Sequence, residues 1–124
     1  MRESLLYLGG ALTILWGSAH LYPTQKVVHG FGGITRDNQL ILTMEWIAEA
    51  ILLIFTGVLL VVMTARFGAE DPATQTVSAV AAAMLLVLAV VSLATGGRVG
   101  FIMYRLRAPI FTMSAALILT GAFA

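Results

Sequence analysis

Apolar residues fill four long stretches of the chain, and shorter segments rich in glycine, proline and charge separate them. An apolar helix needs about 20 residues to cross the roughly 30 Å hydrocarbon layer of a bilayer. The stretches that approach or exceed this length are residues 4–21, 39–65, 73–95 and 108–124. Because backbone groups in lipid must be hydrogen-bonded within their own segment, each stretch is predicted to be an α-helix. We therefore expect one all-α domain over residues 1–124, an integral membrane four-helix bundle.

The ends of these helices have local signals. Asp71 followed by Pro72 is the typical order of an N-cap and a proline at the first helical position, so the span over 73–95 should open there. Asp37 or Asn38 is expected to cap the span that precedes it in the chain. Pro109 is expected in the first turn of the last span.

The segment between the first two spans, residues 23–38, is longer than a hairpin needs. Its apolar residues recur at roughly helical spacing among polar ones, namely Val27, Val28, Phe31 and Ile34. Three glycines in the same segment oppose a long helix. We expect an amphipathic or re-entrant loop that lies along the membrane surface or folds back over the bundle.

Composition places the chain far from soluble proteins and excludes several classes of function. Hydrophobic residues make up 60% of the sequence and charged residues only 10%, whereas soluble domains carry about a quarter charged residues. The net charge of +1 argues against nucleic-acid binding. The chain has no cysteine, which excludes disulfides, thiolate metal sites and thiol redox chemistry.

Basic residues are shared unevenly between the two ends of the predicted bundle. With four spans, both termini lie on one side, together with the loop that contains Arg66. That side has Arg2 and Arg66, and the other side has Lys26, Arg36, Arg98, Arg105 and Arg107. Because loops rich in lysine and arginine face the cytoplasm, we expect both termini outside and the first and third loops inside a bacterial cytoplasmic (inner) membrane.

Two acidic residues stand where the second span begins. Glu45 and Glu49 are one turn apart, so on a helix they share a face at about 6 Å. The first span has a stripe of mostly small residues, which lets helix backbones approach closely in membranes. The stripe consists of Gly9, Thr13, Gly17 and His20. If these two faces meet, the imidazole of His20 arrives at the level of both carboxylates.

This pattern leads to the hypothesis of a polar pocket at one membrane face. Tryptophans concentrate at the membrane–water boundary, and arginines of the third loop belong to the same end of the bundle. The candidate ligand-binding residues are His20, Glu45, Glu49, Trp16, Trp46, Arg98 and Arg105. The alternative is that the glutamates only pair with loop arginines and thereby close the bundle.

The same residues limit the chemistry. A histidine beside two carboxylates can move protons on a lipid-soluble substrate, so an enzyme of this kind would be acid–base, isomerase-like, or quinone-linked. A hydrolase is disfavoured, because Ser18 is two residues from His20 and does not share its helix face. No metal site is expected, since neither histidine has the Glu-x-x-His spacing of di-iron bundles. The sequence assigns no catalytic residue.

The layout resembles the DoxX-like group of small four-span membrane proteins. The matching residues are "GSAH" from Gly17 to His20, "EAILLIFTG" from Glu49 to Gly57, and Arg66 at the end of that span. The match covers about the first half of the chain, and the segment 23–38 has no counterpart in it. The resemblance implies a compact four-helix membrane bundle with a His/Glu pocket. Members of the group are linked variously to quinone-related oxidation and redox defence, and the resemblance implies no substrate.

Three functions follow as hypotheses. The first is binding of a small amphipathic ligand, such as a membrane lipid, a quinone or an isoprenoid, with a redox link. The second is an accessory structural subunit of a larger membrane complex, and the partners considered are membrane lipid, a second copy in a homo-oligomer and that complex. The third is a proton-coupled carrier of small molecules. No cofactor is assigned, although a quinone or a lipid is the candidate.

Overall fold

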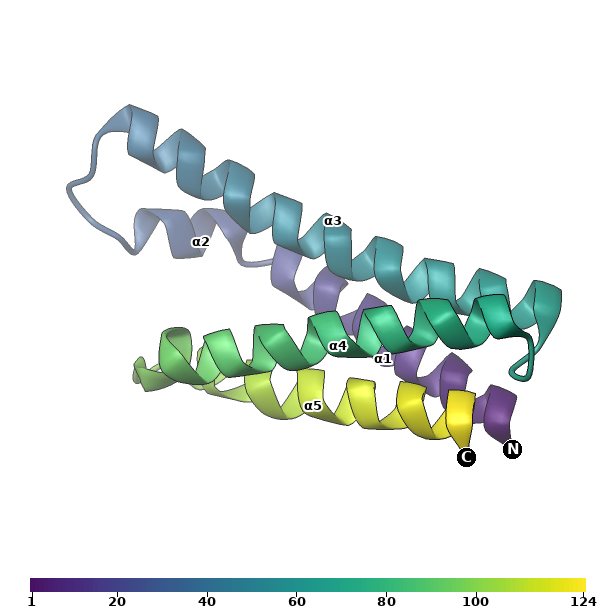
Figure 1. Ribbon diagram of the computed structural model, residues 1–124. Helices are drawn as coiled ribbons and strands as arrows, with labels where there is room; N and C mark the ends of the chain where they lie inside the picture. The colour runs from purple at the N-terminus through teal and green to yellow at the C-terminus, as the bar shows by residue number, and fades with distance from the viewer.

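The computed structural model describes all 124 residues and consists of helices joined by short turns (Figure 1). In chain order the elements are α1 (Arg2–Leu21), α2 (Thr24–His29), α3 (Arg36–Phe67), α4 (Pro72–Ala94), the 3-10 helix η1 (Gly96–Arg98) and α5 (Ile102–Phe123). Strands are absent, so the prediction of an all-α chain is confirmed.

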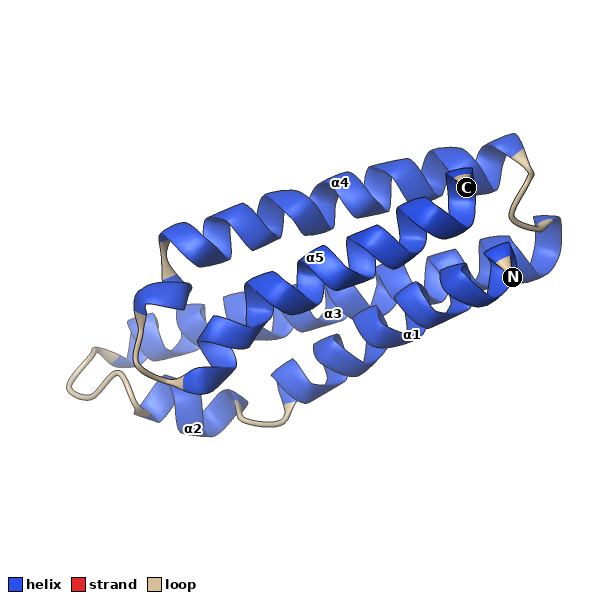
Figure 2. Ribbon diagram, turned by 90° about the horizontal axis from the view of Figure 1, so that it is seen from below, coloured by secondary structure: helices blue, strands red, loops and turns tan.

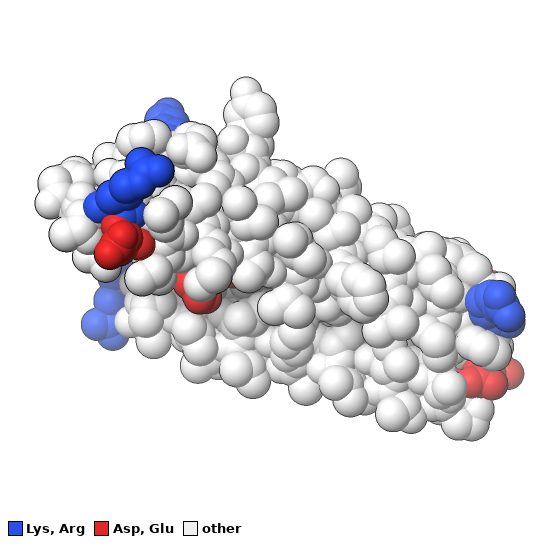
Figure 3. Space-filling model, turned by 90° about the horizontal axis from the view of Figure 1, so that it is seen from above, with Lys and Arg blue, Asp and Glu red and all other residues white.

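The four long helices, α1, α3, α4 and α5, are each long and apolar enough to cross a membrane. Charged side chains gather at the two ends of the molecule, and the surface between them is almost free of charge (Figure 3). A single acidic side chain is visible inside this uncharged belt (Figure 3). Length, composition and charge distribution together indicate an integral membrane protein.

The N-terminal ends of α3 and α4 are both capped by side chains, but only one cap was predicted. Asp71 caps α4 as expected, because its carboxylate accepts a hydrogen bond from the Ala73 N–H at 2.8 Å. The cap of α3 is Thr35 rather than Asp37 or Asn38, and its hydroxyl accepts from the Asn38 N–H at 3.3 Å. Asp37 lies in the first turn instead, where its negative charge is favourable beside the unpaired N–H groups.

The last helix begins earlier than expected. α5 starts at Ile102, six residues before the predicted 108, so Pro109 lies inside the helix rather than in its first turn. Proline costs one intrahelical hydrogen bond there. The residues before it are mostly good helix formers and continue the helix through it. The shift matters because it places Arg107 on a helix instead of in a loop.

Small residues bring α1 into close contact with α3. A Cβ on Gly57 would lie 2.5 Å from the Gly10 carbonyl oxygen, and a Cβ on Gly17 would lie 3.0 Å from that of Ala50. Gly9, another member of the predicted stripe, faces Ile118 of α5 instead. The stripe on α1 is therefore buried as predicted, but it is divided between two neighbouring helices.

Helix α3 does not follow the rest of the bundle along its whole length. α3 packs closely on α1 and α4 packs closely on α5, whereas α3 and α4 make few contacts with each other. In Figure 1, α3 moves away from α4 and α5 towards the end of the molecule where α2 and η1 lie. The bundle is thus open at this end and closed at the end where the chain begins and finishes.

Both termini lie at the closed end, beside the α3–α4 turn (Figures 1 and 2). Arg2 connects α1 to the last turn of α5 there, because its guanidinium donates hydrogen bonds to the carbonyl oxygens of Gly121 and Ala122. Within the segment 23–38, residues 24–29 form α2, which packs beside α3. A position of this segment on the membrane surface stays a prediction.

Candidate functional site

Three helices meet at Glu49. Its carboxylate pairs with the Arg107 guanidinium of α5 through Oε1 and Nη2, and its Oε2 lies 3.4 Å from Nε2 of His20 on α1. His20 is 6% exposed, and the side chains of Glu49 and Arg107 are mostly buried. An anion in such a place needs a nearby cation, because desolvation of an unpaired charge is costly.

Arg107 is held by more than the ion pair. Its guanidinium carbon lies 5.9 Å from the centre of the Phe111 ring, which is itself fully buried. A cation over an aromatic ring at this distance is electrostatically favourable. Phe111 is one turn further along α5, so the helix itself brings ring and guanidinium together.

Trp46 fixes the orientation of His20. The two rings are stacked with 3.9 Å between their centres and 14° between their planes. The indole Nε1 also donates a hydrogen bond of 2.7 Å to the backbone carbonyl oxygen of His20. This carbonyl belongs to the last turn of α1, where carbonyls have no partner within the helix. Trp46 of α3 therefore caps the C-terminal end of α1 and orients the imidazole of His20.

The side chains of His20 and Glu49 are close enough for an ion pair, but they do not form a hydrogen bond with each other. Nε2 of His20 is buried and no protein atom accepts or donates a hydrogen bond at this nitrogen. We therefore regard Arg107 as the main partner of Glu49. His20 is a neighbour close enough to exchange a proton after a small rotation.

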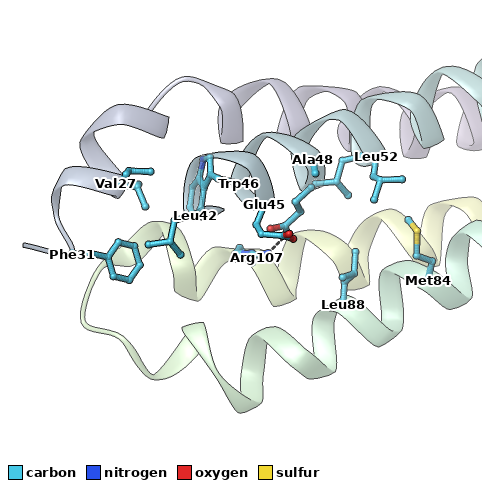
Figure 4. Close-up of a pocket in the computed structure, with 13 residues that line it drawn as sticks. Val27, Phe31, Leu42, Glu45, Trp46, Ala48, Leu52, Met84, Leu88 and Arg107 are labelled. Atoms are coloured by element: carbon cyan, nitrogen blue, oxygen red, sulfur yellow. Dashed lines mark hydrogen bonds and ion pairs between the residues drawn. The ribbon is translucent and has the colours of Figure 1, made fainter. Parts of the chain in front are cut away.

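A cavity of about 490 Å³ opens between α3 and α4 beside this ion pair. Ten of the thirteen residues that line it are hydrophobic. Figure 4 shows Leu42 and Leu52 of α3 facing Leu88 and Met84 of α4 across it. Its polar lining consists of Glu45, Glu49 and Arg107. The cavity thus has mostly apolar walls, and Figure 4 shows Glu45 and Arg107 between the apolar side chains on either side of them.

A second, much smaller hollow of about 30 Å³ lies on the other side of Trp46. Trp16, His20, Tyr104 and Arg107 line it together with Trp46. His20 faces this hollow and does not line the large cavity, whereas Glu49 lines the cavity and not the hollow. The pocket predicted to enclose His20 with both glutamates is therefore divided in two, with the bulky indole of Trp46 in its middle.

The remaining predicted residues lie at different distances from this centre. Glu45 lines the cavity but is exposed and forms no ion pair, and Trp16 lines the hollow. Arg98 is exposed and lines neither space. Arg105 is exposed as well, and its Nε donates to the Val99 carbonyl oxygen at 3.3 Å. The expectation that Arg98 and Arg105 join the glutamates is wrong, because Arg98 lies in η1 and Arg105 in the first turn of α5, where both side chains are exposed.

Arg107 is the site residue that the sequence pattern does not single out. With a last span that begins at 108, it is one of several arginines in the preceding loop. A start at Ile102 would have placed it inside an apolar helix. A basic residue within a membrane span calls for an acidic partner, and α3 has the suitable carboxylates.

No group of three or more histidine, cysteine, aspartate or glutamate side chains is arranged so that it could hold a metal ion.

Comparison of the chain with protein-family models, curated proteins and solved structures finds no match. The resemblance to the DoxX-like group stays a prediction.

Proposed function

We propose that this protein binds a small amphipathic molecule, such as a lipid, a quinone or an isoprenoid, in the cavity between α3 and α4. The observation that supports this best is the character of the cavity itself. Small-molecule sites have volumes of roughly 300–1,000 Å³, mostly apolar walls and a few placed polar groups. A cavity of about 490 Å³ with ten hydrophobic and three charged residues in its lining has these properties.

In this proposal the two parts of the ligand have different environments. The hydrocarbon part lies against Leu52, Leu88 and Met84, where α3 and α4 are apart. The polar part lies near Glu45, Glu49 and Arg107. Because α3 and α4 make few contacts with each other, such a ligand can enter sideways from the membrane without crossing water.

Acid–base or quinone-linked chemistry is a natural extension of this proposal. Glu49 lies 3.4 Å from His20 and borders the cavity, so it can pass a proton between a bound ligand and the imidazole.

The ion pair between Glu49 and Arg107 also favours a second candidate, an accessory structural subunit. In that case the pair serves only to hold α3 against α5, and the hydrophobic surface packs against other membrane proteins. The two candidates differ in what the loss of Glu49 removes: bound ligand in the first, and only stability in the second.

The substitution Glu49→Gln tests the proposal. Protein purified in a mild detergent is analysed by mass spectrometry for bound lipid, quinone and isoprenoid per mole of protein, and circular dichroism checks folding. We expect the bound ligand to fall about tenfold, which corresponds to about 1.4 kcal/mol of binding free energy.

The matched control is Glu70→Gln. Glu70 is also paired with an arginine, but it lies at the closed end, where it contacts Arg2 at 3.2 Å and its side chain is 85% exposed. Its loss should leave bound ligand unchanged. Equal ligand content in both variants, together with reduced thermal stability of Glu49→Gln alone, would favour the structural subunit.

A further inference from the structure

Three nitrogens around the small hollow lack any hydrogen-bond partner within the protein. They are Nε1 of Trp16, Nε2 of His20 and Nε of Arg107, and all three atoms are buried. Their residues come from α1 and α5 and line the same hollow of about 30 Å³. Buried polar groups are almost always hydrogen-bonded, so three unpartnered ones in one place point to a common partner.

The chemistry of these nitrogens defines that partner. The indole nitrogen of tryptophan and the Nε of arginine can only donate, and the Nε2 of histidine can donate in one of its tautomers. An ammonium group or any other pure donor would find at most one acceptor among them, the histidine Nε2 in its other tautomer. A single oxygen with free lone pairs can accept from two or three donors at once.

The size of the hollow agrees with one oxygen atom. A space must offer at least about 10–15 Å³ to the centre of a water-sized probe to hold one water, which then needs two to four polar partners. The hollow offers about 30 Å³, and three of the residues that line it carry a buried nitrogen without a hydrogen-bond partner. It is therefore large enough for one water or one carbonyl oxygen and too small for a whole head group.

We infer that the hollow between Trp16, His20 and Arg107 is a binding site for one hydrogen-bond-accepting oxygen, supplied either by a water molecule or by the carbonyl group of an amphipathic molecule. Access comes from the open end of the bundle. The hollow shares Pro23, Val27, Trp46, Phe101 and Tyr104 with a surface depression of about 550 Å³ between α2 and the start of α5.

The site would have a consequence for the neighbouring ion pair. The nitrogen of His20 that would donate to this oxygen, Nε2, is also the one that lies 3.4 Å from Oε2 of Glu49. The bound oxygen and the Glu49 carboxylate would therefore be neighbours at one imidazole nitrogen. The inference does not depend on a ligand in the cavity between α3 and α4, because it is argued from the nitrogens of Trp16, His20 and Arg107.

The two tryptophans make the test simple, since the chain has only these two and both line the hollow. The full-length protein is labelled with ¹⁵N-tryptophan and placed in lipid nanodiscs. Its spectrum then has two indole N–H signals, and Trp16→Phe identifies which one belongs to Trp16. Trp46 is the internal control, because its indole already donates to the His20 carbonyl oxygen.

Two measurements identify the source of the oxygen. The first is magnetisation transfer between the Trp16 indole proton and long-lived water. The second is the shift of the two indole signals on addition of methyl nonyl ketone, with undecane as the control that lacks the carbonyl. Transfer from water that persists with the ketone identifies water. A shift at Trp16 that exceeds the shift at Trp46, with loss of the water transfer, identifies a ligand carbonyl.

Either result supports the oxygen site. The inference is overturned if the Trp16 indole proton receives nothing from water and responds to the ketone no more than to undecane. Loss of ligand binding in Glu49→Gln with an intact water contact at Trp16 would support both proposals, since the two readouts are separate. A retained ligand with an intact water contact would overturn only the proposed function.

Discussion

Glu49 is the residue on which the site depends, and its surroundings explain how an acidic side chain is accommodated in an apolar helix. Arg107 supplies the opposite charge and His20 a second polar neighbour. Removal of one partner from a buried pair is more costly than removal of both, because it leaves an uncompensated charge. This asymmetry can be measured.

We predict that Arg107→Leu destabilises the protein by about 3 kcal/mol, since it leaves the Glu49 carboxylate mostly buried without its cation. The double variant Glu49→Leu/Arg107→Leu should recover most of this loss. The measurement is the free energy of unfolding in mixed micelles, followed by circular dichroism.

The exposed pair of Arg2 and Glu70 provides the control. Its Glu70 side chain is 85% exposed, so Glu70→Gln should change the free energy of unfolding by less than about 1 kcal/mol. A double variant as unstable as Arg107→Leu alone would show that the arginine acts through its packing on Phe111 and not through the ion pair.

At this scale the sequence indicates the acidic residue of the site, Glu49, but not its basic partner, Arg107. Glu49 stood out because a carboxylate inside an apolar span needs an explanation, and His20 because it ends a stripe of small residues. Arg107 could not be selected among five basic residues without the start of its helix. The division of the pocket by Trp46 depends on ring stacking, which no spacing in the sequence reveals.

At the scale of helices, close backbone contact decides how α1 and α3 pack. The positions of Gly10 and Gly57 leave no room for side chains, since the backbone of one helix lies against the other. Small residues are used in this way where helices associate in membranes. The tight contact between α1 and α3 also positions the site, because it holds His20 at the level of Glu49.

We expect Gly57→Ala to destabilise the protein by about 1–3 kcal/mol, the usual cost of an overpacked contact. The added Cβ would lie 2.5 Å from the Gly10 carbonyl oxygen and 3.1 Å from the Ile14 nitrogen, so backbone would have to move. Thermal unfolding in the same detergent measures the effect.

Gly33→Ala is the matched substitution at an open position, because nothing lies within 4 Å of the added Cβ and its φ is not positive. Its effect should stay within about 0.5 kcal/mol. If neither alanine substitution lowers the thermal stability, the contact between α1 and α3 is looser than described.

The helices themselves were predictable to within a few residues, because length and hydrophobicity identify spans and Asp71-Pro72 identifies the start of one. The errors lie at ends where two signals compete. Pro109 suggested a helix start, yet the helix formers before it continue the turn. Thr35 caps α3 although Asp37 and Asn38 are the stronger capping types.

At the scale of the whole molecule, the open end and the basic end coincide. α3 separates from α4 at the end that holds α2 and η1, and the segments there contain most of the basic residues. We therefore propose that the cavity opens near the cytoplasmic face of the membrane, with both termini outside. Sequence alone could suggest the orientation, whereas the separation of α3 from α4 depends on packing along entire helices.

Single cysteines test this orientation, and the chain has no native cysteine to interfere. Gly33→Cys lies in the turn before α3 and Glu70→Cys in the turn before α4. In intact cells, a membrane-impermeant maleimide should label Glu70→Cys and leave Gly33→Cys unlabelled until the cells are opened. The reverse pattern would place the first loop outside.

The cavity between α3 and α4 is tested most directly by filling it. Ala48 lines the cavity, whereas Ala83 of α4 is exposed and does not line it. Ala48→Phe leaves Glu49, Arg107 and His20 in place, and Ala83→Phe adds the same ring elsewhere on the apolar surface. The readout is the lipid, quinone and isoprenoid that remain bound to each purified variant, measured by mass spectrometry. We expect about a tenfold loss for Ala48→Phe, or about 1.4 kcal/mol, and none for Ala83→Phe. Equal retention by both variants would mean that the cavity is not where the molecule holds a ligand.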